Sequence, residues 1–330
     1  MGIGFRPPFQ RSVHSVFTLH FIIIMSTFSI HTLGCGSAKP TVRHQPSSTV
    51  VNHRDTLYMV DCGEGAQRAF QLARLKFSRL RHIFLTHLHG DHVLGLPGLL
   101  STLALGSTGG KITVHTFADG EKILRQILDF FAKDLSFDLE FNIIKPEDAV
   151  ILETSSLTVR TVKLHHRVPA VGYIFEEKPK LRHIRREMID YHGVPVAKIR
   201  DIKEGADFVK PDGTVIPNAM LTSEADRSLS YAHISDTIYM PELAQKIGPV
   251  DLLFHETTYL DENEAEAKAR FHSTARQAAM TARDSGARVL LTGHYSSRYK
   301  DETRFVTEAS EVFPRVLLNR EGLVTDICRL

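Results

Sequence analysis

The chain has 330 residues, of which 42% are hydrophobic, and a formal net charge of +2. It can therefore bury a large core, as one α/β domain or two smaller ones. The near-neutral charge excludes an overall cationic nucleic-acid binder but allows a local basic patch. Three cysteines, Cys35, Cys62 and Cys328, are too few and too scattered for a disulfide framework, which favours a reducing, cytoplasmic setting.

The first 24 residues combine features of a targeting segment with features that argue against one. Arg6 and Arg11 precede the apolar run VFTLHFIII, in the manner of a secretory signal peptide. Two histidines interrupt this region, no small-x-small cleavage site follows it, and the run is too short to span a bilayer. We therefore predict that residues 1–24 are an N-terminal extension outside the fold, with Met25 as an alternative start.

Residues 25–330 are predicted to form a single domain, because strand-like and helix-like stretches alternate to the end without a Ser/Gly/Pro linker. The first half predicts a strand at 28–34, a hairpin at 48–63 turning near Arg54 and Asp55, a helix at 65–77, strands at 82–87 and 111–117, a helix at 120–135 and a strand at 156–166. The second half predicts strands at 229–237, 250–258 and 287–294, with a helix at 274–286 before the last strand.

The segment at about 177–220 differs from its surroundings. It is rich in charged residues, Gly and Pro, and shows little apolar periodicity beyond one short helix. We interpret it as an arm that projects from the body, with its own small hairpin at 207–216. The stretch KPKLRHIRR brings cations together, as a surface that tracks phosphates requires, although such a run is also typical of a solvated face; the cations are Lys178, Lys180, Arg182, Arg185 and Arg186.

Polar residues gather where the predicted strands end. Asp236, His255 and His294 each follow an apolar strand, as do the histidine pair His165–His166 and the cluster THLHGDH at 86–92. Functional groups of layered α/β folds collect on loops at one edge of the sheets. Five strands that deliver His or Asp to one edge therefore predict a functional site there.

The spacing within THLHGDH favours metal binding. Extended residues at i and i+2 share a side, so His87 and His89 can ligate one ion together. Gly90 then permits a sharp change of direction. Asp91 and His92 lie beyond that bend, where they can serve a second ion, and His and carboxylate ligands suit zinc.

THLHGDH resembles the signature of the metallo-β-lactamase superfamily, whose fold is an αββα four-layer sandwich. Further stretches, in family order, resemble ribonuclease Z, the endonuclease that trims tRNA 3′ ends: LGCGSAKPT, VDCGEGAQ, FSRLRHIFLTHLHGDHVLGLPGLLST, HRVPAVGY, SDT, HETTY, FHSTARQAA and LTGHYSSRY. The resemblance extends from about residue 28 to the C-terminus. It implies an α/β sandwich of this type with a projecting arm.

Carried over to this sequence, the resemblance implies two Zn²⁺ per subunit, although the ligand types also tolerate Mn²⁺ or another divalent ion. His87, His89 and His166 would hold one ion, whereas Asp91, His92 and His294 would hold the other. Asp236 would bridge the two ions. Asp91 would also orient or deprotonate the attacking water, and His255 would protonate the leaving 3′ oxygen.

The sequence indicates the residues that contact RNA less clearly than the metal ligands. Ser37 lies where the opening turn can approach the substrate, and Arg43 follows it in a place where the family often has Arg-Asn. His272 precedes Ser273 and Thr274, either of which can cap the next helix. Because helix N-termini attract phosphate, His272 is predicted to touch the RNA backbone; the alternative is that this segment only caps the helix. Arg298 is predicted to clamp a phosphate or to form a surface salt bridge.

The expected activity is hydrolysis of precursor tRNA that leaves a 3′-hydroxyl on the tRNA and a 5′-phosphate on the trailer. The resemblance also implies a homodimer in which the arm of one subunit serves the site of the other. We expect no membrane and no DNA partner. The alternatives are a small-molecule phosphodiesterase, or another hydrolase with the same metal core, and a metal-dependent RNA-binding protein without activity.

Overall fold

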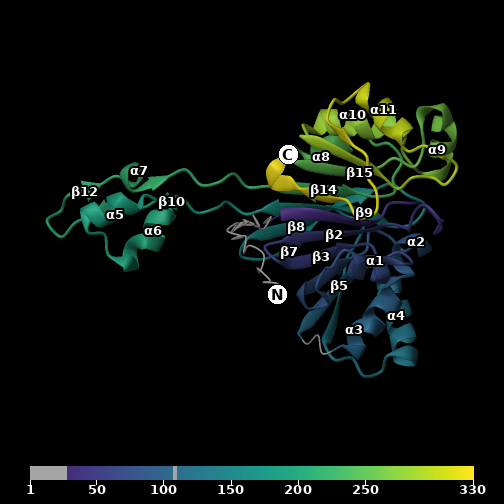
Figure 1. The fold of residues 1–330 in the computed structure, drawn as a ribbon, viewed down its shortest axis with the longest axis horizontal. Helices are drawn as coiled ribbons and strands as arrows, with labels where there is room; N and C mark the ends of the chain where they lie inside the picture. Colours follow the sequence, from purple (N-terminus) through teal and green to yellow (C-terminus); the bar gives the residue numbers. More distant parts are fainter. Residues whose placement is uncertain (1–27, 107–109) are drawn as a thin grey trace, which may run out of the picture.

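The computed structural model describes residues 28–106 and 110–330 (Figure 1). The predicted N-terminal extension lies outside the described residues. Two seven-stranded sheets pack face to face, and helices cover the outer face of each sheet (Figure 1). This is the predicted αββα arrangement.

The first sheet contains the N-terminal half of the body and one C-terminal strand. Its order is β18-β1-β2-β3-β4-β5-β6. The strands are β1 (Phe28–Gly34), β2 (Ser48–His53), β3 (Thr56–Val60), β4 (Leu80–Phe84), β5 (Lys111–Thr116), β6 (Asp138–Ile143) and β18 (Val324–Asp326). Strands β3 to β6 are mutually parallel, so the carboxyl ends of β4 and β5 meet at one edge.

The second sheet has the order β17-β16-β15-β14-β9-β8-β7. Its strands are β7 (Ala149–Glu153), β8 (Leu157–Leu164), β9 (Ala170–Glu177), β14 (Ser230–Ile234), β15 (Leu252–Glu256), β16 (Val289–Gly293) and β17 (Val316–Leu317). Strands β14, β15 and β16 are parallel. The residues that follow these three strands therefore lie at the same edge of the sheet.

Three apolar layers hold the sandwich together. Side chains of both sheets, such as Phe84 and Phe175, form the core between them. Outside the first sheet, α1 (Ala66–Leu72), α3 (Leu96–Leu105) and α4 (Ala118–Phe131) bury a second cluster. Outside the second sheet, α8 (Leu243–Ile247), α10 (Ala275–Ser285) and α11 (Thr303–Ser310) bury a third. The amphipathic patterns at 120–135 and 274–286 correctly predicted α4 and α10.

The arm leaves the body after β9 and returns before β14 (Figure 1). It contains β10 (His183–Ile184), α5 (Arg186–His192), α6 (Ile199–Lys203), the hairpin β11 (Phe208–Val209) and β12 (Val215–Ile216), α7 (Asn218–Leu221) and β13 (Thr222–Ser223). The hairpin at 207–216 is as predicted. The arm has more helices than its sequence suggested, because apolar residues scattered among the charges form a small core of its own, which includes Ile189, Ile202, Phe208 and Leu221.

Several predicted elements end earlier than their patterns suggested. The helix predicted at 65–77 ends at Leu72, after which Arg74 takes a left-handed conformation (φ 55°). The strand predicted at 250–258 ends at Glu256, and His255 is its last residue but one. Two short helices complete the edge near the site, α2 (Gly90–Val93) and α9 (Glu264–Arg270). Within the described ranges, no helix has the length and apolar character needed to cross a bilayer.

Candidate metal centre

Loops that follow β4, β8, β14 and β16 meet at one edge of the sandwich. His87 and His89 come after β4, and His166 comes after β8. Asp236 follows β14, and His294 follows β16. Residues that are up to 207 positions apart in sequence therefore converge, because parallel strands of one sheet end at the same edge.

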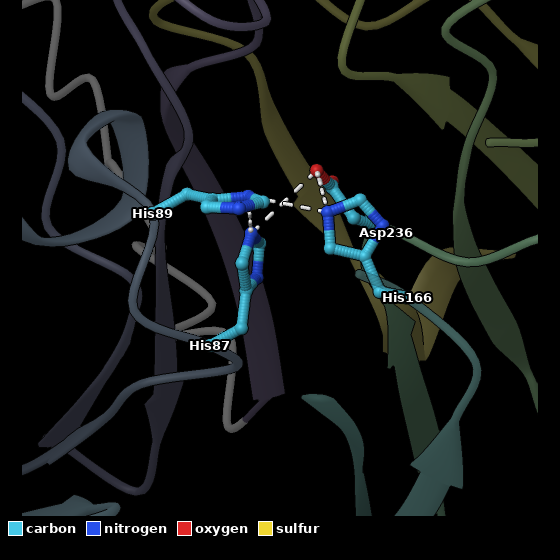
Figure 2. Close-up of side chains that lie close together, drawn as sticks. All are labelled: His87, His89, His166 and Asp236. Atoms are coloured by element: carbon cyan, nitrogen blue, oxygen red, sulfur yellow. Dashed lines mark hydrogen bonds and ion pairs between the residues drawn. The ribbon is translucent and has the colours of Figure 1, made fainter. Parts of the chain in front are cut away.

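The first ligand group consists of three histidines and one carboxylate (Figure 2). Nδ1 of His89 lies 3.0 Å from Nε2 of His87 and 3.2 Å from Nε2 of His166. Oδ2 of Asp236 lies 3.6 Å from Nε2 of His87 and 3.7 Å from Nε2 of His166. A tetrahedral zinc ion with ligands at about 2.0–2.1 Å has ligand atoms separated by roughly 3.3 Å, so this group matches the size of such a site.

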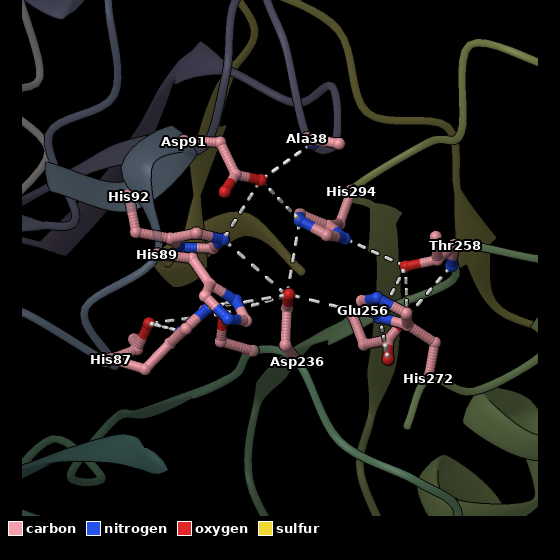
Figure 3. A network of polar contacts seen from close by, with 12 residues as sticks. Ala38, His87, His89, Asp91, His92, Asp236, Glu256, Thr258, His272 and His294 are labelled. Carbon is pink, nitrogen blue, oxygen red and sulfur yellow. Dashed lines mark hydrogen bonds and ion pairs between the residues drawn. The ribbon is translucent and has the colours of Figure 1, made fainter. Parts of the chain in front are cut away.

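The second ligand group uses the other oxygen of Asp236 (Figure 3). Oδ1 lies 3.2 Å from Nε2 of His294 and 3.7 Å from Nε2 of His92. Oδ2 of Asp91 lies 3.5 Å from both of these nitrogens. Each carboxylate oxygen of Asp236 thus faces a different group, which is the geometry that a bridging ligand needs.

The donor atoms themselves fit a metal better than a hydrogen-bond network. Nε2 of His92 and Nε2 of His294 are buried and have no hydrogen-bond partner among the described residues. A buried polar atom without a partner is costly unless another group satisfies it. Burial lowers the pKa of His87, so its imidazole is neutral, which is the form that binds a metal.

Asp61 orients His92 from behind. Nδ1 of His92 donates to Oδ2 of Asp61 over 2.7 Å, and both residues are buried. The backbone N–H and the hydroxyl of Thr86 hold the same carboxylate at 2.8 Å. A carboxylate that accepts from the far nitrogen of a ligand histidine fixes its tautomer and raises its basicity. Asp61 lies in VDCGEGAQ, which was singled out as a motif, but its role was not predicted.

The other ligand histidines are oriented in the same way. Nδ1 of His294 lies 2.8 Å from Oγ1 of Thr258, and Nδ1 of His166 lies 2.9 Å from the carbonyl oxygen of Phe271. Each bond leaves Nε2 aimed at the ligand group. His165 is exposed and packs its ring on Phe271, so only His166 reaches the centre.

Asp91 is held by the opening turn. The backbone N–H of Ala38 donates to Oδ2 of Asp91 over 2.7 Å. Burial opposes ionisation, but His294 and His92 hold the pKa of Asp91 below its ordinary range. The loop that carries His294 holds this opening turn in place. The N–H of Tyr295 donates to the carbonyl of Cys35, and the N–H of Ser37 donates to the carbonyl of Tyr295.

The structure does not support a proton-donor role for His255. Successive side chains of a strand point to opposite faces. Glu256 faces the site, where it accepts from the N–H groups of Thr237 and Ser273 (Figure 3). His255 therefore faces away, is buried, and bonds through Nδ1 to the carbonyl oxygen of Glu256 over 2.8 Å.

His272 occupies the position at the site that His255 was expected to fill. Its Nδ1 lies 3.1 Å from Oε1 of Glu256 and 3.9 Å from Oδ2 of Asp236 (Figure 3). Burial lowers the pKa of His272, but the carboxylates of Glu256 and Asp236 outweigh this effect and raise the pKa to about 9. The helix cap is a separate feature, since Thr274 accepts from the N–H of Gln277 in a capping box.

A cavity of about 350 Å³ opens beside the two ligand groups. Ser37 and His272 line it, as predicted for residues near the substrate. Two cations that the sequence did not single out, Arg167 and Arg270, also line it. Both are exposed, and Arg270 pairs with Glu266 over 3.4 Å.

Arg43 and Arg298 do not line this cavity. Arg298 donates to both oxygens of Glu266 at 2.6 and 2.5 Å, which is the salt bridge that was the alternative to a phosphate clamp. Arg43 binds Glu302 and donates to the carbonyls of Tyr299 and Lys300. Both arginines fasten loops in this structure.

Most of the predicted cations of the arm are paired with carboxylates. Lys178 lies 3.3 Å from Glu153, and Lys180 lies 2.7 Å from Glu177. Arg182 pairs with Glu224 at 2.9 Å and Arg186 with Asp190 at 3.1 Å, whereas Arg185 precedes α5 as its N-cap residue. The charge of the arm is therefore partly neutralised, and its role in RNA binding stays a prediction.

Comparison with known proteins agrees with the geometry. The family model of the anti-Pycsar protein Apyc1 matches residues 28–179, less than half of the chain. A ribonuclease Z of Parabacteroides distasonis is 48% identical over 300 residues, which cover 91% of this chain and 99% of that protein. The chain belongs to the ribonuclease Z family. This confirms the resemblance inferred from the motifs.

Solved structures show the fold of this family member. Human tRNase Z, short form, is 22% identical, with a TM-score of 0.65 over 91% of this chain and 99% of the human one. The metallo-β-lactamase fold protein YhfI from Bacillus subtilis is 17% identical, with a TM-score of 0.63 over 90% and 98% of the two chains. The predicted metallo-β-lactamase sandwich is thus confirmed.

Proposed function

We propose that this chain is a metal-dependent endoribonuclease that removes the 3′ trailer from precursor tRNA, leaving a 3′-hydroxyl on the tRNA and a 5′-phosphate on the trailer. Membership of the ribonuclease Z family supports hydrolysis of RNA phosphodiester bonds. The observation that carries the proposal is the division of Asp236 between two ligand groups, with an open cavity beside them.

Two Zn²⁺ ions are the proposed cofactors, with Mn²⁺ as a substitute of similar ligand preference. His87, His89 and His166 would hold one, Asp91, His92 and His294 the other, and Asp236 both. When bound, paired ions of this kind activate water at neutral pH and neutralise charge that develops on a phosphodiester.

Asp91 is proposed to orient the attacking water. The N–H of Ala38 holds one of its oxygens in place. His294 and His92 keep the pKa of Asp91 low, so the carboxylate stays ionised and can accept a hydrogen bond from the water.

His272 is the proposed donor to the leaving 3′ oxygen, in place of His255. It lines the cavity, and Glu256 fixes its ring through Nδ1, which leaves Nε2 as the second N–H of the cationic ring. The buried carboxylate of Glu256 stabilises this cation before the proton is transferred. His255 does not line the cavity and is buried within β15.

Arg167 and Arg270 are proposed to bind the phosphates that flank the cut, because both line the cavity and extend into solvent. Ser37 lines the same cavity. Cations at such positions attract the RNA backbone without reading its sequence.

We also propose that the arm acts on a second subunit of a homodimer. The arm leaves at the carboxyl end of β9, which is antiparallel to β14, whereas the ligands follow the carboxyl ends of β8 and β14. It therefore projects from the end of the sheet opposite to its own metal centre (Figure 1). An arm of this orientation can serve a partner's site but not its own. A reducing, cytoplasmic location is proposed, since the three cysteines form no disulfide among the described residues.

The test is cleavage of an end-labelled precursor tRNA, with and without a chelator, followed by mapping of the cut. We expect one cut at the start of the trailer, which chelation abolishes and added Zn²⁺ restores. An arylphosphodiester is assayed in parallel. Rapid hydrolysis of that compound without any cleavage of the RNA would overturn the proposal in favour of a small-molecule phosphodiesterase.

A further inference from the structure

A second cavity lies at the opposite end of the sandwich from the metal centre. Its volume is about 720 Å³, roughly twice that of the cavity at the ligands. It opens where β3 to β6 of the first sheet face β7 and the turn before β8. No residue lines both cavities, so the two are separate. A volume of this size suits a small organic ligand.

A chain of hydrogen bonds presents a fixed donor to this cavity. Nδ2 of Asn142 lies 2.9 Å from Nδ1 of His115, and Nε2 of His115 lies 3.1 Å from Nδ1 of His82. If the amide nitrogen donates, the protons of both imidazoles are on Nε2, and His82 has a free N–H on a residue that lines the cavity. Tyr58 stacks on His82 and Phe84 on His115, which fixes both rings.

Cations surround the same donor. Arg54, Arg81 and Lys111 line the cavity, against one carboxylate, Glu140, which lies 2.6 Å from Lys111. Burial, together with the positive charges of Lys111 and Arg81, lowers the pKa of His82 to about 4. The cavity therefore has an excess of positive charge, which an anion would neutralise.

The remaining walls are of two kinds. One offers hydroxyl groups from Thr56, Thr154, Ser155 and Ser156. The other is apolar and contains Ile151 and Leu152, whereas the ring of Phe141 packs on the opposite face of β6, under Arg125 of α4. A ligand that fills the cavity would need a phosphate-like group for the cations, hydroxyl groups for the serines and threonines, and an apolar part for Ile151 and Leu152.

We propose that this cavity binds a nucleoside monophosphate, with its phosphate at Arg81, Lys111 and the N–H of His82 and its ribose at the hydroxyl wall. The proposal does not depend on the catalytic role of the metal centre. Neither the two ligand groups nor the arm contributes a residue to the cavity.

The experiment is calorimetric titration of the full, metal-loaded chain with uridine 5′-monophosphate, and with uridine, ribose 5-phosphate and inorganic phosphate as separate arms. We expect uridine 5′-monophosphate to bind most tightly and uridine to bind at least tenfold more weakly, because uridine lacks the anion. Binding of inorganic phosphate as tight as that of the nucleotide would reduce the site to a simple anion site and overturn the proposal.

Variants separate this cavity from the metal centre. Arg81→Gln with Lys111→Gln should raise the Kd of the nucleotide at least tenfold, while Lys122→Gln, an exposed cation of α4 outside the cavity, should leave it unchanged. Thermal unfolding of each variant checks that the fold persists. Nucleotide binding that survives unchanged in the double variant would belong to the metal centre and contradict the assignment.

Discussion

Oε1 of Glu256 lies 3.1 Å from Nδ1 of His272, and both side chains lie beside the shared ligand Asp236 (Figure 3). Glu256 ends β15, and His272 follows α9. Glu256 is fully buried, and it is satisfied by N–H groups from two loops. In the proposed mechanism, this pair makes His272 rather than His255 the donor to the leaving group.

His272→Ala should lower kcat on precursor tRNA by about 10²–10⁴-fold, the usual contribution of a general acid. Metal content should stay near that of the unchanged chain, because all proposed ligands remain. The matched variant is His255→Ala, which should lower the free energy of unfolding by about 1–3 kcal/mol yet keep the turnover of folded protein within tenfold. The reverse ranking in single-turnover assays would return the donor role to His255.

Glu256→Gln should shift the pH dependence of kcat. Glu256 helps to raise the pKa of His272 to about 9, so without its charge this pKa falls. The donor then loses its proton at lower pH, and the alkaline limb of the pH–rate profile moves toward lower pH. An unchanged alkaline limb in a variant that still melts cooperatively would show that another group is the donor.

Asp61→Asn should weaken metal binding although Asp61 touches no metal in the proposed centre. Its carboxylate orients His92, and loss of such a partner typically costs about 10–100-fold in metal affinity. Elemental analysis after dialysis against a weak chelator gives the metal content. Asp55→Asn, at the half-buried turn between β2 and β3, is the control and should retain the full complement.

Arg167→Gln and Arg270→Gln should each raise KM for precursor tRNA by several-fold and leave the metal content intact. Each should also reduce the slope of log binding constant against log salt by about 0.7–0.9, as expected for one lost phosphate contact. Arg298→Gln should have a smaller effect, because Arg298 does not line the cavity and both oxygens of Glu266 hold its guanidinium group. Equal slopes in all three variants would contradict the placement of the phosphates at the cavity.

Removal of the arm should weaken tRNA binding far more than hydrolysis of an arylphosphodiester. The two ends of the arm lie close together, since Oγ of Ser228 donates to the carbonyl of Lys178 over 3.1 Å, so a short Gly-Ser linker can replace residues 180–226. The whole arm is removed because a deletion of only part of it would expose its apolar core. Losses of the same size on both substrates would refute a binding role.

The sequence by itself determined the strands that precede the ligand candidates and, through the family resemblance, the sandwich, but not β6, β7, β9, β17 or β18. His87 and His89 share a side because they are two residues apart in an extended segment, and this relation is local. The strand patterns before Asp236 and His294 are also local, and parallel strands carry these residues to a common edge. Motif resemblance selected His166 over His165, and the structure places only His166 at the centre.

Only the tertiary structure decided which neighbouring groups act on these residues. The end of β15 assigns Glu256 to the site and His255 to the core, and a difference of one residue in a strand end cannot be read from an apolar pattern. Arg298 pairs with Glu266, which lies 32 positions away in sequence. His82 bonds to His115, which lies 33 positions away. Spacing along a chain fixes which side chains share a face, whereas charge pairing and burial depend on segments that meet only after folding.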